Sequence, residues 1–422
     1  MSEPLRVAIV SDSQAYPSIN DWGMSNLDKA FKLLAPKKPE VLLMAGDLAD
    51  GTNYATFDFY KKLLDRHFPG GIIHVGCAGN HDYWTPRGVV RDPEAIYREF
   101  CTRIGQPVAN PLHQVVKGIS FIAFSEDFSG RHSPEMLDKL ETEIQKAIAR
   151  DPVKPVFVIT HFPPADTMSG SFNESGRPEL RELFDRYKQV VSISGHTHYP
   201  LEDERCIWQE KFTAFTTDTL AYSCMSDGYY NACGKVIVPF AREAVQVLFM
   251  EIYDDHFDIH RYNVDDQREI KPDAVWKVAI PYDPTHPSYG EARKAMRPAP
   301  QFPAGAKGMF RYDFGYFYLL FDPAEHPDFV HYYTIRIIEC DGNSEKVVSE
   351  EKFAAGFYRL ARYQGGREVF RIPSEAITPG AHCRFEIFPV ESFGNAGEPL
   401  VFEIDVPNAS MLRCGRPECP QE

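Results

Sequence analysis

The sequence lacks the features by which membrane-spanning and exported proteins are usually recognised. No stretch approaches the roughly 18 consecutive apolar residues that a membrane span needs. The N-terminus carries no basic segment followed by an apolar stretch and a small-residue cleavage site, so no secretory signal is visible. No internal repeat or low-complexity tract is found in the 422 residues. We therefore expect a protein located in the cytoplasm that makes no membrane contact.

The charge and the cysteines argue against two further classes. The chain has 45 basic against 60 acidic residues, a net charge of −15, and nonspecific binding to nucleic acid needs a basic face instead. The nine cysteines are scattered and odd in number, in a chain too long to depend on disulfides, so we expect free thiols. An acidic chain can still bind an anion where a metal ion supplies the local positive charge.

Short apolar runs alternate with amphipathic segments in the first half of the chain. Runs this short and this apolar predict strands that are buried on both faces. They lie at residues 5–10, 40–46, 71–77, 119–124, 155–160 and 190–194. Residues 134–149 between them predict a helix, because Ser133 suits its N-cap and Pro134 its first turn. Alternating strands and helices predict an α/β core.

The pattern changes after about residue 211 to strands without long helices. Two of these runs, 243–253 and 257–264, would either extend the first sheet or form a second sheet packed on it. Strands, helices and strands again within one domain predict a layered α/β sandwich. We expect this first domain to span residues 1–290.

The C-terminal part differs in composition. Residues 291–308 are rich in alanine and proline without an apolar period, which predicts a linker or domain edge. Residues 309–411 hold alternating strands separated by turns, which predicts a small all-β sandwich. Within it, residues 377–399 resemble a fibronectin type III-like module, and such modules bind a partner or pack on a catalytic domain. Residues 412–422 are expected to form a loose tail.

Side chains able to bind a metal follow five of the predicted strands directly. They are Asp12, Gln14, Asp47, Asn80, His161, His196 and His198. The carboxyl ends of the strands line the ligand crevice of an α/β sheet, so these residues are expected to meet at one edge. Carboxylate, carboxamide and imidazole together suit divalent metals such as Mn, Fe, Zn, Co or Ni. Each motif alone is an ordinary turn, helix cap or surface pair, but five at successive strand ends indicate a metal site.

These motifs resemble those of the calcineurin-like metallophosphoesterase superfamily. They are SDSQ (11–14), GDLAD (46–50), GNHD (79–82), the Thr160-His161 pair and GHTH (195–198), in this order. The resemblance covers about the first 200 residues, and the strands to about residue 265 fit the family's two-sheet sandwich. It implies a four-layer α/β/β/α fold with two divalent metal ions, and hydrolysis of a soluble phosphate monoester or diester.

The resemblance also implies roles for individual residues. One metal would be held by Asp12, Gln14, Asp47 and His198, and the other by Asp47, Asn80, His161 and His196, with Asp47 bridging both. His81 would be the catalytic histidine that faces the substrate. Asp82 would either orient it and stabilise its protonated ring or simply cap the next helix, whereas Asp50 is expected to be structural. A metal-bound hydroxide would attack phosphorus while His81 donates a proton to the leaving oxygen.

Gln14 departs from the family pattern, which usually reads Asp-x-His at this block. A carboxamide oxygen is a weaker donor than imidazole to Zn or Fe, so a site with Gln14 as ligand would favour Mn or Mg. The alternative is that Gln14 only hydrogen-bonds the metal-bound solvent.

Substrate recognition is less legible in the sequence. Tyr83 and Trp84 would stack on a base or sugar, or else be core aromatics, and Arg87 and Arg177 would pair with phosphate or be solvated. A small phosphorylated substrate is the expected partner, and the sequence leaves the oligomeric state open. The alternative function is a catalytically silent scaffold or binding protein of the same fold. Such members usually lose several ligands and the catalytic histidine, which this chain keeps.

Overall fold

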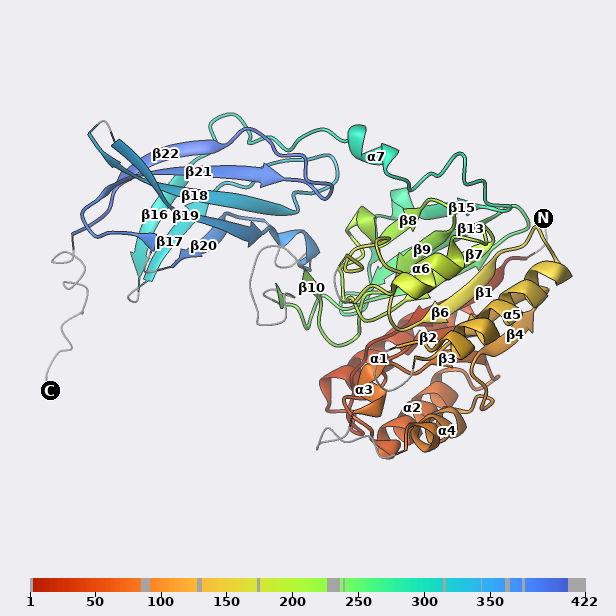
Figure 1. Cartoon of the computed structure of the whole chain (residues 1–422). Helices are drawn as coiled ribbons and strands as arrows, with labels where there is room; N and C mark the ends of the chain where they lie inside the picture. Colours follow the sequence, from red (N-terminus) through yellow and green to blue (C-terminus); the bar gives the residue numbers. More distant parts are fainter. Residues whose placement is uncertain are drawn as a thin grey trace, which may run out of the picture. The chain divides into compact units, whose positions relative to one another are not determined.

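The computed structural model describes residues 3–84, 92–126, 131–172, 175–225, 236–237, 240–313, 316–342, 344–360, 365–373 and 376–408. The chain divides into two compact units (Figure 1). The first comprises Met1–Met225 with Ile237–Arg293, and the second comprises Ser226–Val236 with Lys294–Glu422.

Two mixed sheets form the first unit. The seven-stranded sheet contains, in spatial order, β14 (Glu269–Ile270), β13 (His256–Asn263), β12 (Gln246–Ile252), β1 (Leu5–Val10), β2 (Val41–Ala45) and β3 (Ile73–Cys77), with β15 (Trp276–Ala279) also paired to β13. The six-stranded sheet contains β4 (Leu112–Val116), β5 (Ile119–Ala123), β6 (Val156–Thr160), β7 (Val190–Ser194), β9 (Thr213–Thr216) and β8 (Ile207–Gln209). The short strands β10 (Cys224–Met225) and β11 (Val236–Ile237) pair separately.

The six predicted strands of the first half are all present, three in each sheet. β1, β2 and β3 run parallel, and so do β5, β6 and β7. The late strands β12 and β13 extend the first sheet, because β12 pairs antiparallel with β1 along its length. The sequence left open whether these late strands extend the first sheet or build a second one, and the pairing decides for extension.

The helices are α1 (Trp22–Leu34), α2 (Tyr54–His67), α3 (Asn80–Tyr83), α4 (Pro93–Ile104), α5 (Pro134–Arg150), α6 (Pro178–Phe184) and α7 (Ala292–Ala295). Short 3₁₀ turns lie at Ala35–Lys37, Glu204–Cys206, Pro272–Ala274 and Gly356–Tyr358. The predicted helix is α5, and the Ser133 hydroxyl accepts the Met136 N–H at its first turn as expected of an N-cap. No helix within the described residues is both long and apolar enough to cross a membrane.

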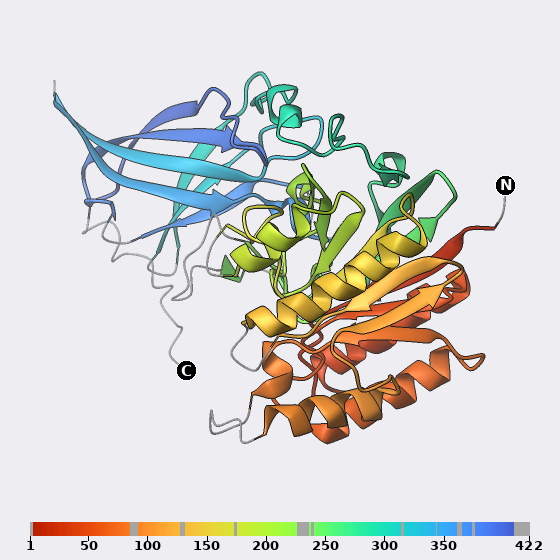
Figure 2. The same cartoon turned by 45° about the vertical axis from the view of Figure 1, so that its right-hand side comes forward.

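The first unit has four layers, because helices cover the outer faces of its two sheets (Figure 2). One cluster lies between α1, α2 and α4 and the outer face of the first sheet, for example Phe31, Phe57 and Leu42. A second cluster, which includes Leu140 and Val158, lies between α5 and α6 and the second sheet. The predicted α/β/β/α sandwich is therefore confirmed.

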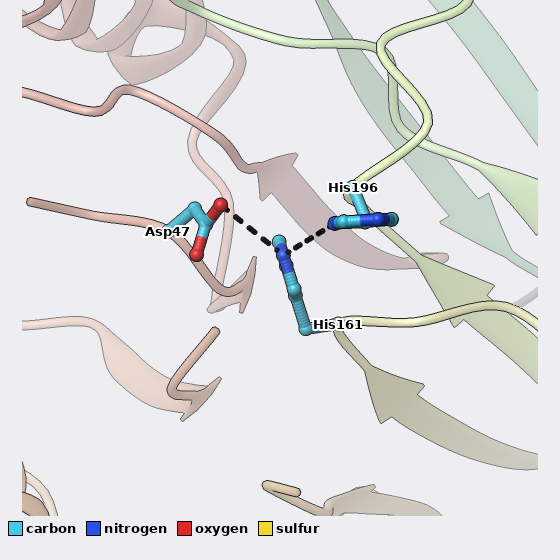
Figure 3. A group of neighbouring side chains, drawn as sticks. All are labelled: Asp47, His161 and His196. Atoms are coloured by element: carbon cyan, nitrogen blue, oxygen red, sulfur yellow. Dashed lines mark hydrogen bonds and ion pairs between the residues drawn. The ribbon is translucent and has the colours of Figure 1, made fainter. Parts of the chain in front are cut away.

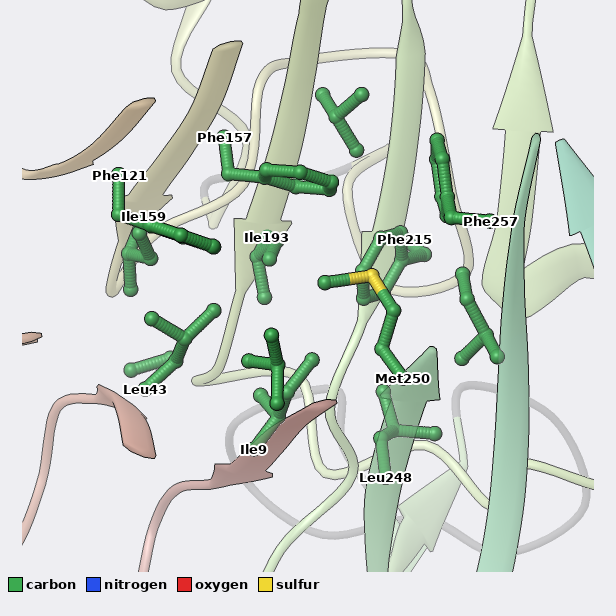
Figure 4. Close-up of a cluster of buried hydrophobic side chains, with 14 of the residues drawn as sticks. Ile9, Leu43, Phe121, Phe157, Ile159, Ile193, Phe215, Leu248, Met250 and Phe257 are labelled. Carbon is green, nitrogen blue, oxygen red and sulfur yellow. The ribbon is translucent and has the colours of Figure 1, made fainter. Parts of the chain in front are cut away.

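The central core lies between the two sheets (Figure 4). Ile9 and Leu43 from the first sheet meet Phe121, Phe157 and Ile193 from the second, and all five are fully buried. Burying one such side chain contributes about 1.5–3 kcal/mol, so this layer fixes the two sheets against each other. The loops at the carboxyl ends of their parallel strands are thereby held in place.

The second unit contains two antiparallel sheets. One has three strands, β16 (Gly308–Asp313), β17 (Tyr316–Phe321) and β20 (Glu368–Ile372). The other has four, β19 (Ser344–Ala354), β18 (Tyr332–Asp341), β21 (His382–Val390) and β22 (Leu400–Asp405). Buried residues of both sheets, such as Leu319, Ile335 and Phe385, share one core, which confirms the expected all-β architecture. The closer resemblance to fibronectin type III modules stays a prediction, and the tail at 412–422 lies outside the described residues.

Candidate metal centre

The predicted metal ligands lie on loops with unusual backbone conformation. Five of the seven have φ between 43° and 65°, in the left-handed region. They are Asp12, Gln14, Asp47, His196 and His198. A residue with a side chain rarely adopts this conformation, which costs on the order of 1 kcal/mol or more per residue. Such strained residues cluster at functional sites, so their gathering here supports a functional role for these loops.

The ligand atoms of four residues converge on one point (Figure 3 shows three of them). His161 Nε2 lies 3.0 Å from Asn80 Oδ1, 3.2 Å from Asp47 Oδ2 and 3.2 Å from His196 Nδ1. Asp47 and His161 are buried, and the ligand atoms of Asp47, His161 and His196 all lie within 4.8 Å of one another. Within the described part of the chain, no other three acidic, histidine or cysteine side chains each bring one ligand atom within 4.8 Å of the other two.

The outward-facing nitrogens of two histidines are fixed by backbone carbonyls. His161 Nδ1 donates to Ala45 O at 2.9 Å, and His198 Nδ1 donates to Tyr222 O at 2.8 Å. Each bond leaves Nε2 facing the carboxylates. Histidines that bind metals are typically held by such a bond from the nitrogen that does not coordinate.

The charges of this cluster are strongly coupled. Burial alone would raise the pKa of Asp47, but the positive charge of His161 and its hydrogen bond to Asp47 hold that pKa far below its usual value. Burial alone would lower the pKa of His161, whereas the charge of Asp47 raises it to about 10. The cluster therefore has a carboxylate that strongly favours a positive charge beside it.

The donor set fits a divalent cation. One proton on His161 Nε2 cannot satisfy Asn80 Oδ1, Asp47 Oδ2 and His196 Nδ1 together, since a single N–H makes one good hydrogen bond. A metal cation, in contrast, can bind all of these oxygen and nitrogen atoms at once. Carboxylate and carboxamide oxygens with imidazole nitrogens are ligands that Mn, Fe, Zn, Co and Ni share.

The other predicted ligands lie beside this cluster but are less tightly gathered. His198 Nε2 lies 3.1 Å from Asp12 Oδ1, and both Asp12 carboxylate oxygens accept the backbone N–H of His196 at 3.1 Å. Gln14 presents its amide nitrogen to Asp47 Oδ2 at 3.5 Å, so its oxygen is not the atom facing the carboxylate. The structure thus joins Asp12 to His198 and Gln14 to Asp47.

His81 differs from expectation in its partner. Its Nδ1 donates to Asp50 Oδ1 at 2.9 Å, and its Nε2 lies 3.8 Å from Asp47 Oδ2. Of the two roles predicted for Asp82, orienting His81 or capping the next helix, the hydrogen bonds agree with the second, because its oxygens accept the backbone N–H groups of Ala49 and Gly79, each at 2.9 Å. Asp82 caps the turn that forms α3 and does not contact the His81 ring through any of these bonds.

The burial of Asp82 has an electrostatic consequence. Its side chain is fully buried, and burial together with repulsion from the Asp47 charge raises its pKa to about 7, against the effect of the two backbone bonds. Asp50 was expected to be structural, and the sequence reasoning did not predict its hydrogen bond to His81. The available signal was its place in GDLAD, three residues after Asp47, on the loop that carries the buried carboxylate.

The rim residues divide between core and surface. Tyr83 is buried among the side chains under the first sheet's helices, whereas Trp84 is half exposed with its ring 3.9 Å from that of His81. The Arg177 guanidinium lies over the Phe162 ring at 3.6 Å, and that ring lies 4.0 Å from His196. Arg87 lies outside the described residues.

Comparison with known proteins identifies this region. Residues 5–200 match the family model of calcineurin-like phosphoesterases. This part of the chain is therefore a calcineurin-like phosphoesterase domain, and the predicted enzyme class, a metal-dependent phosphoester hydrolase, is confirmed. No curated protein matches the chain.

The solved structures to which this chain is similar include two phosphatases and one protein whose title names a different role. A dimetal phosphatase from Danio rerio is 11% identical and aligns over 67% of this chain and 100% of its own, with a TM-score of 0.47. Purple acid phosphatase PPD1 from yellow lupin (Lupinus luteus) seeds is 14% identical over 66% of this chain and 54% of its own, with a TM-score of 0.48. GAP50, described as the anchor in the inner membrane complex of Plasmodium, is 11% identical over 70% of this chain and 93% of its own, with a TM-score of 0.43.

Proposed function

We propose that this protein hydrolyses a small, soluble phosphate monoester or diester with two divalent metal ions. Asn80, Asp47, His161 and His196 would hold one ion, and Asp12, Gln14, Asp47 and His198 would hold the other. When bound, two such ions neutralise the charge of the phosphoryl group and lower the pKa of a water molecule that attacks it. The protein's own contribution is to place the ligands and a proton donor.

The observation that carries this proposal is the convergence at His161. Three electronegative atoms from separate loops lie within 3.0–3.2 Å of its Nε2, in a buried setting. Neighbouring acceptors this close repel one another unless a positive charge lies among them. The single Nε2 proton of His161 can serve only one of these acceptors, whereas a metal ion would serve all of them, and Asp47 would then be shared between the two ligand sets.

His81 supports the second part of the reaction. Because Nδ1 donates to Asp50, the proton that His81 can give away is the one on Nε2, the nitrogen nearer Asp47. The Asp50 carboxylate stabilises the protonated ring until that proton passes to the leaving oxygen. His81 is then neutral, and its Nδ1–H still donates a hydrogen bond to Asp50.

The test is hydrolysis of para-nitrophenyl phosphate and its bis-ester by metal-stripped protein with Mn²⁺ added back. Wild type is expected to turn over at least one ester only with metal, and the ratio of the two rates distinguishes a monoesterase from a diesterase. Asp47→Asn should abolish turnover and most metal binding. His81→Ala should keep the metal and lower kcat by about 10²–10⁴-fold, the usual contribution of a proton donor, on an ester with an alkoxide leaving group such as benzyl phosphate, and by much less on the para-nitrophenyl esters.

Two results would contradict the proposal. Unchanged turnover of benzyl phosphate in His81→Ala would remove the proton-donor role. Absence of both metal binding and turnover in wild type would favour the alternative, a scaffold that keeps the fold without catalysis.

A further inference from the structure

The hydrogen bonds of His81 continue beyond Asp50 to a tyrosine. Asp50 Oδ1 accepts from His81 Nδ1 at 2.9 Å, and Asp50 Oδ2 accepts from the Tyr16 hydroxyl, also at 2.9 Å. Both oxygens of the carboxylate are therefore occupied, each by a different donor. A carboxylate held at two points has far less freedom to rotate than one held at a single point.

The ring of His81 is restrained from its face as well. The Trp84 ring lies 3.9 Å from it at an interplanar angle of 37°. An aromatic ring packed against an imidazole restricts rotation of the imidazole out of its plane, and it excludes water from that face.

Backbone hydrogen bonds join the three segments that carry these side chains. Ala15 N donates to Leu48 O at 3.0 Å and Asp50 N donates to Ala15 O at 3.3 Å, which ties the Tyr16 segment to the Asp50 loop. On the other side, Gly51 N donates to His81 O at 3.1 Å, and Thr52 N donates to Trp84 O. Tyr16 and Trp84 thus belong to one bonded frame around His81.

We propose that Tyr16 and Trp84 are positioning residues that hold His81 for proton transfer to the leaving oxygen. Tyr16 acts through Asp50 on Nδ1, and Trp84 acts on the ring face, so that Nε2 keeps one direction. The inference rests on the proposed function, since it needs His81 as the proton donor. In the step itself the P–O bond to the leaving group breaks, its electron pair stays on the leaving oxygen, and that oxygen takes the proton of His81 Nε2.

Exposure distinguishes these two residues from structural aromatics. Tyr16 is 48% and Trp84 is 49% exposed, so neither owes its place to burial in the core. Within the described residues, Tyr16 donates its hydroxyl to Asp50 and Trp84 packs its ring against His81, so both side chains contact the pair directly. Removing the hydroxyl or the indole is therefore expected to leave the fold and its stability intact.

The test compares leaving groups in Tyr16→Phe and Trp84→Leu. Para-nitrophenolate leaves readily without a proton, whereas the alkoxide from benzyl phosphate needs one. Both variants are expected to lower kcat for the benzyl ester by about fivefold more than for the para-nitrophenyl ester, the effect of losing one hydrogen bond or ring contact to a charged pair. KM should change much less than kcat, and Trp84→Phe should recover part of the loss.

The matched control is Tyr253→Phe. Its hydroxyl also donates to a carboxylate, that of Glu251 at 3.3 Å, but on the β12–β13 turn rather than on a loop that carries a predicted ligand. This variant is expected to behave as wild type with both esters. Bound Mn²⁺ and the midpoint of thermal unfolding are measured for every variant, and both should match wild type.

The outcomes separate this inference from the proposed function. Wild type without metal-dependent turnover of para-nitrophenyl phosphate, its bis-ester or benzyl phosphate contradicts the proposed function, and the inference falls with it. Turnover in wild type with an equal loss on both esters, or with no loss, overturns the positioning role alone. Loss confined to kcat on the benzyl ester supports it.

Discussion

At the scale of single residues, the candidate metal centre requires its loops to pack so closely that no additional side-chain atom fits between them. Gly79 shows this most clearly. A Cβ added there would lie 2.3 Å from Asp47 Oδ1, 2.7 Å from Asp47 N and 2.8 Å from His161 Cγ. Glycine is therefore required at this position for space, because two of the residues predicted to bind metal pass directly over its backbone.

Gly79→Ala is accordingly expected to damage the centre without removing any ligand. The methyl group displaces Asp47 or His161, and we expect Mn²⁺ affinity to fall by about 10–100-fold, as when the support of a metal ligand is lost. Calorimetric titration of metal-stripped protein measures this. Gly70→Ala is the control, because nothing lies within 4 Å of a Cβ there. Equal affinities for the two variants would show that the loops yield more easily than these distances indicate.

At the scale of helices and strands, the central layer between the sheets carries much of the stability. Phe157 on β6 is fully buried and its ring lies 5.3 Å from those of Phe121 and Phe257, so residues of both sheets surround it. The loop that bears His161 follows the same strand. Loss of this ring would therefore loosen the packing of the strand that leads to His161.

Phe157→Ala is expected to lower the free energy of unfolding by about 3–5 kcal/mol, the usual cost of deleting a fully buried aromatic ring. Urea denaturation gives this value. Phe172→Ala, at a side chain that is 66% exposed, should change it by less than about 0.5 kcal/mol. A small effect at Phe157 would mean that the two sheets repack around the cavity.

In this chain, sequence patterns predict helices and strands well, but they predict strand pairing and side-chain directions poorly. Runs such as 5–10 and 155–160 are nearly all apolar because both faces of these strands are covered, and that burial makes them recognisable. The ends of the same strands located the loops that carry the predicted metal ligands. The pattern does not predict which sheet β12 joins, since pairing partners far apart in the chain leave no local trace.

The same limit applies within the centre. Asp50 and Asp82 stand at similar distances from the motif glycines, and their sequence context does not reveal which one contacts His81. The direction of each side chain depends on the left-handed turn at Asp47 and on the backbone N–H groups that Asp82 captures. Gln14 likewise shows only in three dimensions that its amide nitrogen faces Asp47.

At the scale of the whole molecule, the division into two compact units predicts that the first unit folds without the second. The three core clusters of the first unit draw their buried residues from between Leu5 and Ile280. The buried cluster of the second unit begins at Phe317. Each unit therefore has its own hydrophobic core, which is the usual requirement for folding alone.

A chain that ends after Arg293 is expected to fold cooperatively and to bind Mn²⁺ with the affinity of the full chain. Circular dichroism during urea unfolding and calorimetric titration measure the two properties, with the full chain as reference. Aggregation or a non-cooperative transition would show that the first unit needs the second for its stability. Such a result would also contradict a catalytic domain confined to about the first 290 residues.

The central claim is that Asp47 joins two metal sites, and counting bound metal tests it most directly. Metal-stripped wild type and Asp47→Asn are titrated with Mn²⁺ in a calorimeter under identical conditions. The account predicts two ions per chain for wild type and loss of most binding in the variant, since Asp47 belongs to both ligand sets. Wild type that binds no Mn²⁺, or a variant that still binds two ions with unchanged affinity, would contradict it.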